Sequence, residues 1–206
     1  MRVGYRGRKS PAMYRIAALY HFTRFDEPAT LQGPLQALCE AERISGSLLP
    51  AREGINGTIA GPAAGISAVL AHIRALPGCD GLEWKESAAA TQPFRRMKVR
   101  LKKEIVTMGQ PDVDPRARVG HYVEPAGWND LIRSPDVAVI DTRNDYEVAI
   151  GTFEGAVDPQ TATFRDFPAW WEENKHRFHN KRIAMFCTGG IRCEKSTNYL
   201  LGQGVE

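Results

Sequence analysis

Apolar residues in the first half of the chain recur with two different periods. Over residues 29–43 and 63–76 they fall every three or four positions, which predicts two amphipathic helices. Pro28 stands just ahead of the first helix, and Pro77-Gly78 ends the second. Shorter apolar or aromatic runs surround the helices and predict strands at 16–22, 47–49, 55–59, 82–86 and 97–106.

Up to the strand at 82–86, the order of these elements is strand, helix, strand, strand, helix, strand, and the strand at 97–106 follows. It is the order of a ferredoxin-like, acylphosphatase-like α+β sandwich. A turn between the second and third strands, which pair with each other, accounts for Gly54 and for the nearby Asn56-Gly57. The first half of the chain is therefore expected to form one domain of this kind.

Strands alternate with helices in the second half of the chain. Four consecutive apolar residues at 137–140, and four more at 183–186, are typical of parallel strands that are buried on both faces. A doubly wound α/β domain with a parallel sheet follows from this alternation. Its other expected elements are a short strand at 122–123 and helices at 127–132, 164–178 and 194–201.

A stretch rich in Pro, Gly and Asp separates the two patterns and reads as a linker. The chain begins with a basic segment that lacks the apolar core of a secretory signal. We therefore predict four parts. They are a disordered leader at 1–13, an α+β domain at 14–108, a linker at 109–117 and an α/β domain at 118–206.

Charge is divided unevenly between the two halves, although the net charge of the whole chain is only +3. Residues 1–110 carry 16 basic and 9 acidic side chains, whereas residues 111–206 carry 11 and 15. A basic half joined to an acidic half suggests that the first half meets a polyanion. No stretch approaches the roughly 18 apolar residues of a membrane helix, so we expect no membrane partner.

The chain has four cysteines, Cys39, Cys79, Cys187 and Cys193. Their spacing fits neither a zinc site nor a dense disulfide framework. Free thiols in a reducing cytoplasm are the simpler interpretation, and no metal or other cofactor is evident. The expected localisation is therefore cytoplasmic.

Cys187 directly follows the strand expected at 183–186, at the strand end where open α/β sheets bind ligands. Gly189 and Gly190 allow consecutive N–H groups to point at one centre and form an anion-binding loop. A helix expected to start near Cys193 adds its positive end, and Arg192 adds a fixed cation. These features favour a thiolate with a lowered pKa at Cys187, in a loop of Thr188, Gly189, Gly190, Ile191 and Cys193.

Each of these residues also has a simpler interpretation. Cys187 could be a small buried residue after a strand, although Cys-x-x-Gly-x-Arg at a strand–helix junction is more specific than that. Cys193 could be a resolving thiol that forms a disulfide with an oxidised Cys187. The favoured interpretation of Cys193 is a packed residue in the first helical turn.

Cations and apolar residues alternate along the strand expected at 97–106. The period of two places four cations on one strand face and three apolar groups on the other. The cationic face is either a solvated outer face of the sheet or a stripe that follows the phosphates of RNA. The cations are Arg96, Lys98, Arg100 and Lys102, and the apolar residues are Met97, Val99 and Leu101.

The segment from Phe186 to Ser196 resembles the active loop of rhodanese-like domains. Asp141-Thr142-Arg143 with Glu147 resembles the Asp-x-Arg…Glu motif of the same family. Asp141 and Glu147 could be acid–base groups, but the favoured interpretation is that they anchor loops, with Arg143 as an ion-pair partner. The six residues from Cys187 to Arg192 are similar to those of sulfurtransferases, whereas the related phosphatases use a loop one residue longer.

Three further segments, at 14–22, 52–58 and 94–106, extend the resemblance over nearly all of residues 14–206. Together with the cysteine loop they resemble the bacterial tRNA uridine hydroxylase family with a rhodanese domain. That resemblance implies conversion of the wobble uridine of certain tRNAs to 5-hydroxyuridine. It implies tRNA as partner, with dioxygen and an unknown reductant as co-substrates. Cys187 and Arg192 would be the catalytic residues.

A rhodanese domain continues past the helix expected at 194–201 into another strand and helix, and members of the family then run on into a segment with Cys-x-x-Cys pairs. The second domain is therefore expected to be truncated at its C-terminal end. Two alternative functions remain open. One is a sulfurtransferase that forms a persulfide on Cys187, and the other is a non-catalytic RNA-binding or sensor module built on the same scaffold. No protein partner is evident.

Overall fold

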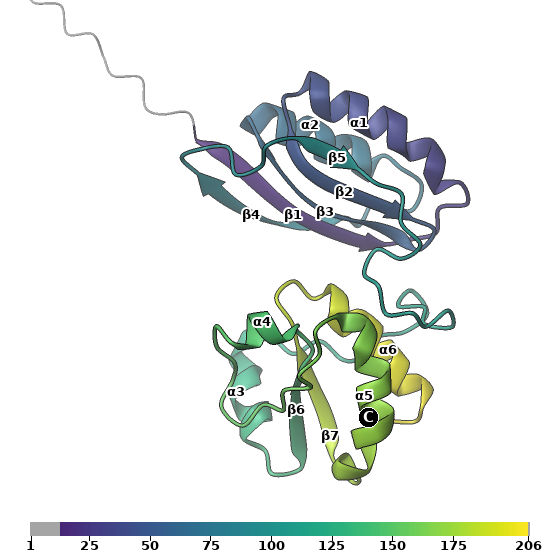
Figure 1. Cartoon of the computed structure of the whole chain (residues 1–206), viewed down its shortest axis with the longest axis vertical. Helices are drawn as coiled ribbons and strands as arrows, with labels where there is room; N and C mark the ends of the chain where they lie inside the picture. Colours follow the sequence, from purple (N-terminus) through teal and green to yellow (C-terminus); the bar gives the residue numbers. More distant parts are fainter. Residues whose placement is uncertain (1–12, 206) are drawn as a thin grey trace, which may run out of the picture. The chain divides into compact units, whose positions relative to one another are not determined.

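The computed structural model describes residues 13–205 and divides into two compact units, with the boundary after Ile105 (Figure 1). The leader expected at 1–13 lies outside the described residues except for Met13. The helices of the first unit are a 3-10 helix, η1 (Pro28–Leu31), followed by α1 (Gln32–Ala41) and α2 (Ala63–Arg74). Its strands are β1 (Tyr14–Phe22), β2 (Ser45–Ala51), β3 (Gly54–Gly61), β4 (Glu83–Ala89) and β5 (Met97–Val99).

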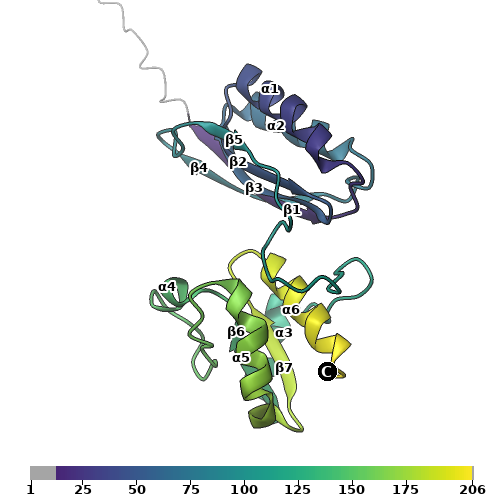
Figure 2. The ribbon, with the colours of Figure 1, turned by 45° about the vertical axis from the view of Figure 1, so that its right-hand side comes forward.

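The five strands of the first unit form one sheet in the order β4-β1-β3-β2-β5. Neighbouring strands are antiparallel except for β5, which runs parallel to β2 at the sheet edge. The predicted α+β order is therefore confirmed, with β5 added beside β2. Both helices cover the same face of the sheet and leave its other face free of helices (Figure 2).

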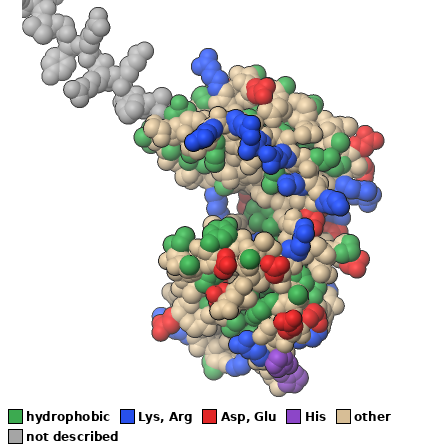
Figure 3. All heavy atoms as spheres, viewed as in Figure 1, with side chains coloured by type: hydrophobic (Ala, Val, Ile, Leu, Met, Phe, Trp, Pro, Cys, Tyr) green, Lys and Arg blue, Asp and Glu red, His purple; other side chains and the backbone are tan. Residues whose placement is uncertain are grey.

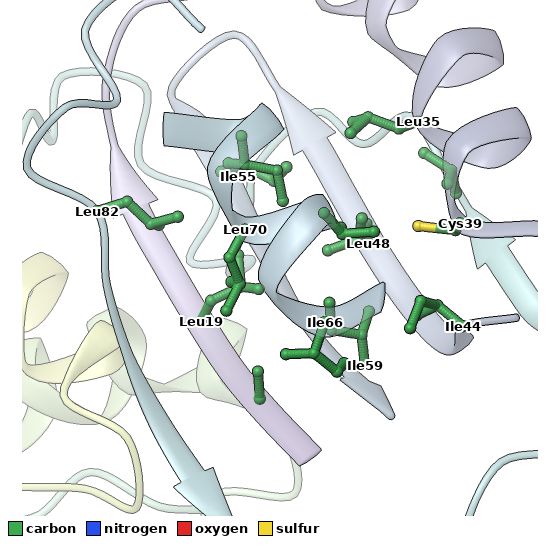
Figure 4. Packing of buried hydrophobic residues seen from close by; sticks show 14 of the residues in the cluster. Leu19, Leu35, Cys39, Ile44, Leu48, Ile55, Ile59, Ile66, Leu70 and Leu82 are labelled. Carbon is green, nitrogen blue, oxygen red and sulfur yellow. The ribbon is translucent and has the colours of Figure 1, made fainter. Parts of the chain in front are cut away.

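The core of the first unit lies between these helices and the covered face of the sheet. Alternation along β1 buries Ala17 and Leu19, while Ala18 between them is exposed. Leu48 of β2 and Ile66 of α2 are fully buried in the same cluster (Figure 4). Burying a side chain of this size is worth roughly 1.5–3 kcal/mol, so this layer accounts for much of the stability of the unit.

The strand predicted at 97–106 is shorter than expected. Met97 and Val99 are buried as predicted, but Leu101 is 44% exposed rather than packed on the apolar face. The side chain of Gln36 in α1 accepts the Val99 N–H at 2.9 Å, and Gln32 donates to its carbonyl at 2.8 Å. Helix side chains thus bind both backbone groups of Val99 on the outer edge, and β5 ends at this residue. The chain still bonds to β2 beyond it, through the N–H groups of Arg100 and Lys102.

The second unit is a small α/β unit around a two-stranded parallel sheet of β6 (Val137–Asp141) and β7 (Arg182–Phe186). Val157 adds one parallel bridge to Ile140. The strand predicted at 122–123 was wrong, because Tyr122 is 64% exposed and its hydroxyl bonds to Glu194 instead. The helices are α3 (Pro125–Arg133), α4 (Asp145–Val148), η2 (Phe164–Asp166), α5 (Phe167–Asn174), η3 (Lys175–Phe178) and α6 (Ile191–Gly202).

Residues 106–108, predicted to end the first domain, and the segment predicted as a linker at 109–117 both pack as part of the second unit. Met108 is buried in its core, and the carbonyl of Val106 accepts a hydrogen bond from the buried Lys195 at 3.0 Å. Asn198 exchanges hydrogen bonds with the backbone of Asp114 at 2.9 and 3.1 Å. The unit boundary therefore lies after residue 105 rather than after 108. Across the described residues, no helix is long and apolar enough to cross a membrane.

Candidate active site

Cys187 lies in the turn that joins the end of β7 to the start of α6. The helix was expected to start near Cys193, but it begins at Ile191, so Arg192 and Cys193 both lie in its first turn. Gly190 caps the helix with a φ of 98°, a conformation that L side chains rarely adopt. Glycine at this position therefore lets the chain turn sharply enough to bring the helix start back toward Cys187.

Several donors converge on the sulfur of Cys187. The thiol of Cys193 donates a hydrogen bond to it and is the largest influence on the pKa of Cys187, which falls to about 5. Burial opposes this effect, while the N–H groups of Cys193, Gly190 and Gly189 add to it. The Gly190 nitrogen lies 3.0 Å from the sulfur. Cys187 is therefore a thiolate at neutral pH, as the loop predicted.

Cys193 supplies what the sequence did not identify, a side-chain donor to Cys187. This hydrogen bond, together with burial, raises the pKa of the Cys193 thiol well above its ordinary value. The Thr142 hydroxyl also lies 3.8 Å from the Cys193 sulfur. Because the thiols interact this strongly, they titrate as a pair that holds one proton at neutral pH.

The guanidinium of Arg192 binds the carboxylate of Glu147 from α4 by two hydrogen bonds, of 2.6 and 2.8 Å. Thr188 donates to the same carboxylate at 2.7 Å. Burial lowers the pKa of Arg192, but Glu147 and the Cys187 sulfur raise it more, so the side chain stays charged. Arg192 is therefore engaged in holding the loop rather than free to face substrate. We call the contacts of Glu147 with Arg192 and Thr188 the clamp.

Asp141 and Arg143 form a second ion pair under the same loop. Asp141 is fully buried at the end of β6, and its carboxylate accepts hydrogen bonds from Arg143, the shortest of 2.6 Å. Thr152 donates to the same group at 2.8 Å, and Arg143 also donates to the carbonyls of Glu147 and Gly151. The pair thus fixes the segment that carries Glu147. Asp141 and Arg143 therefore support the cysteine loop indirectly.

A cluster of three aromatic rings that includes Phe186, the residue before Cys187, was not singled out from the sequence. The ring of Phe186 packs edge to face against Phe153, with 4.8 Å between the ring centroids, and against Trp128, with 6.3 Å between the ring centroids. Phe153 is 40% exposed, so part of this cluster faces solvent. Trp128 and Phe153 lie far from the cysteine in sequence, and no motif or period connects them to it.

The remaining candidate residues are one member of the cysteine loop and four cations of the first unit. Ile191 begins α6, and Arg96, Lys98, Arg100 and Lys102 belong to the first unit. Among residues 13–205, no group of three or more His, Cys, Asp or Glu side chains is arranged to hold a metal ion.

Fold and site together define a protein with an α+β domain followed by an α/β unit that presents a reactive cysteine. The UPF0176 acylphosphatase-like domain family matches residues 14–105. A tRNA uridine(34) hydroxylase of Roseobacter denitrificans is 73% identical over 94% of this chain and 66% of its own length. One of Ruegeria pomeroyi is 78% identical over 94% and 64%. The chain belongs to the tRNA uridine(34) hydroxylase family and spans about two thirds of the length of these relatives.

Proposed function

We propose that this chain carries out the 5-hydroxylation of the wobble uridine of tRNA, with Cys187 as the working group. The observation that carries the proposal is the Cys187 sulfur, which lies 3.0 Å from the Gly190 nitrogen in a loop whose donors, with the Cys193 thiol, lower the pKa of Cys187 to about 5. Relatives that match 94% of the chain are named tRNA uridine(34) hydroxylases, which supports uridine 34 as the target.

We assign the second unit to the rhodanese type. Its cysteine follows a parallel strand, its loop has six residues from Cys187 to Arg192, and its Asp-x-Arg…Glu residues support that loop. In this assignment Cys187 bonds covalently to the reacting partner and Arg192 holds the shape of the anion-binding loop. Asp141, Arg143 and Glu147 are positioning residues. The loop that surrounds the sulfur comprises Thr188, Gly189, Gly190, Ile191 and Cys193.

The chemistry needs co-substrates in addition to tRNA. Replacing C5–H of uridine by C5–OH with dioxygen places one oxygen atom on the base and releases the other as water. This balance takes up two electrons and two protons, which a reductant must supply. We propose dioxygen and such a two-electron reductant as co-substrates. The thiolate supplies a nucleophile that can bond to carbon, oxygen or sulfur at neutral pH.

Deletion of the gene tests the proposal in cells. Nucleosides from the bulk tRNA of the deletion strain are compared by mass spectrometry with those of the parent and of a strain that carries the gene on a plasmid. The proposal predicts loss of 5-hydroxyuridine on deletion and its return with the plasmid. Unchanged 5-hydroxyuridine in a host without a second pathway would overturn it.

A persulfide on Cys187 is a second candidate, because donors that stabilise a thiolate also stabilise the terminal sulfur of a persulfide. In this reaction the thiolate takes sulfane sulfur from a donor such as thiosulfate, which leaves as sulfite, and cyanide accepts the sulfur as thiocyanate. Steady thiocyanate formation that is lost in Cys187→Ser supports sulfur transfer. Negligible turnover with thiosulfate and other sulfane donors counts against it.

A further inference from the structure

The edge of the first unit's sheet carries a continuous run of positive charge. Residues 95–103 contain six Lys or Arg side chains and no Asp or Glu. None of these six takes part in an ion pair identified within residues 13–205. Lys and Arg side chains gather along β5 and the coil that follows it (Figure 3). Charge that is not neutralised inside the molecule is available to an anionic partner.

A hollow of about 650 Å³ lies at the N-terminal end of this run. We call it the edge groove. One wall is the start of β2 and the other is the coil that leads into β5, so the groove follows the sheet edge. Its lining consists of Gly46, Ser47, Pro93, Phe94, Arg95, Arg96 and Lys98.

Hydrogen bonds from both sides hold the edge groove in shape. The N–H of Gly46 donates to the carbonyl of Arg96 at 3.1 Å, which ties the coil to β2. The side chain of Gln92 donates to the carbonyl of Ala60 at 3.1 Å, which anchors the start of the same coil on β3. The backbone that carries the cations of the groove is therefore in place before any partner arrives.

The groove is continuous with the face of the sheet that the helices leave uncovered. Lys98 lies opposite Ser47 in the register of β5 with β2, and Ser47 lies opposite Thr58 of β3. Their neighbours Met97 and Leu48 are buried in the core, so these three residues project to the helix-free side. A strand of nucleic acid lying on this face would meet small polar side chains, with cations at the edge.

We propose that the edge groove binds one nucleotide of a single-stranded RNA segment. Arg95, Arg96 and Lys98 bind the phosphate, and the half-buried ring of Phe94 stacks on the base. An aromatic ring beside several cations suits a nucleotide better than a simple anion, because the ring contributes nothing to binding charge alone. This inference rests on the proposed function and deepens it by placing a tRNA contact on the first unit.

The test measures binding of a fluorescein-labelled seven-nucleotide single-stranded RNA to the full-length protein by fluorescence anisotropy. Phe94→Leu keeps an apolar side chain but removes the aromatic ring, and we expect it to weaken RNA binding about fivefold or more. Arg96→Ala should weaken binding and lower the slope of log affinity against log salt by about one. Arg24→Ala is the control, because Asp26 already pairs with this exposed cation at 3.0 Å.

Heparin, a polyanion without bases, distinguishes a nucleotide site from a charged surface. The proposal predicts that Arg96→Ala weakens binding of both heparin and RNA, whereas Phe94→Leu weakens binding of RNA alone. Full RNA affinity in Phe94→Leu, with an unchanged melting temperature, would overturn the nucleotide site. The nucleotide site would also be overturned if the protein bound anionic phospholipid vesicles but did not bind the RNA. Either result leaves the deletion test of hydroxylation unaffected, so the two proposals fail separately.

Discussion

Glu147 holds Arg192 by two hydrogen bonds, one from Nη1 to Oε2 of 2.6 Å and one from Nη2 to Oε1 of 2.8 Å. The same carboxylate accepts a bond from Thr188 at 2.7 Å. One side chain of α4 thus fixes both the residue after Cys187 and the first turn of α6. The shape of the cysteine loop therefore depends on a residue 40 positions earlier in the chain.

Replacing Glu147 by Gln removes the charge from this clamp and nearly keeps its shape. We expect the free energy of unfolding to fall by about 2 kcal/mol, because hydrogen bonds to charged groups contribute roughly 1.5–3 kcal/mol. Urea denaturation at pH 7 measures the difference. Glu154→Gln, at an exposed position of the same unit, should change stability by less than about 0.5 kcal/mol.

The contribution of Glu147 also has a defined pH dependence. The hydrogen bond from Arg192 lowers the pKa of Glu147 to about 2 in the folded protein, from an ordinary value of 4.5. A lowered pKa stabilises the folded state fully above the ordinary value, and this stabilisation is lost as the pH falls through about 2. The stability difference between Glu147→Gln and the parent should therefore shrink as the pH falls from 5 toward 2. A constant difference over that range contradicts the clamp.

Cys193 should control the titration of Cys187. Its thiol is the largest influence that lowers the pKa of Cys187 to about 5, so Cys193→Ala should raise that pKa by about one unit or more. Cys193→Ser retains a donor and should preserve more of the lowering. The pH profile of iodoacetamide labelling, read by peptide mass spectrometry, reports these values.

Arg192→Ala is the informative comparison in the same assay. Sequence reasoning assigned the lowered pKa partly to Arg192, but Glu147 already binds this guanidinium. We therefore expect Arg192→Ala to shift the pKa of Cys187 less than Cys193→Ala does. A larger pKa shift in Arg192→Ala than in Cys193→Ala would mean that Arg192 is the main cause of the lowered pKa of Cys187.

The two loop glycines should differ in their tolerance of a side chain. Gly190 has a φ of 98°, where an alanine is strained, whereas a Cβ at Gly189 would meet nothing within 4 Å. We expect Gly190→Ala to destabilise the protein by roughly 1–2 kcal/mol and to slow alkylation of Cys187. Gly189→Ala should have little effect on stability. Equal melting temperatures of the two variants argue against the turn described at Gly190.

Labelling at pH 7 should discriminate sharply among the four cysteines. Burial raises the pKa of Cys39 to about 12 and that of Cys79 to about 11, and both side chains are fully buried. Cys187 alone should therefore react with iodoacetamide in the native protein, while all four react in urea. Rapid native labelling of Cys39 or Cys79 means that the first unit opens more readily than its packing indicates.

Periodicity was sufficient for the first unit and less so for the second. The spacing of Leu35 and Cys39, and of Ile66 and Ile73, predicted helices because each pair faces one core. The pair Tyr122-Val123 is typical of a strand in sequence, but the Tyr122 hydroxyl donates a hydrogen bond to Glu194 at the surface. Met108 looked like the end of the first domain and Asp114 like part of a linker, and only the tertiary contacts place both in the second unit.

The cysteine loop was recognisable because its residues are consecutive in sequence. The partners that complete the site lie elsewhere in the sequence and were harder to recognise. Glu147 could be named only through a family motif, and its contact with Arg192 depends on how α4 packs. The Cys193 thiol points at Cys187 because α6 begins at Ile191, and a helix start is uncertain by about two residues from sequence alone.

The central claim is that the Cys187 thiolate carries out hydroxylation of tRNA. The most direct measurement is 5-hydroxyuridine in tRNA from a strain whose only copy of the gene, at full length, encodes Cys187→Ala. Cys193→Ser in the same strain serves as the control for a substituted loop that keeps the nucleophile, and immunoblotting shows that both variants accumulate. The account predicts that 5-hydroxyuridine is absent with Cys187→Ala and at least partly retained with Cys193→Ser. Parental levels of 5-hydroxyuridine with Cys187→Ala, in a host without a second pathway, would contradict it.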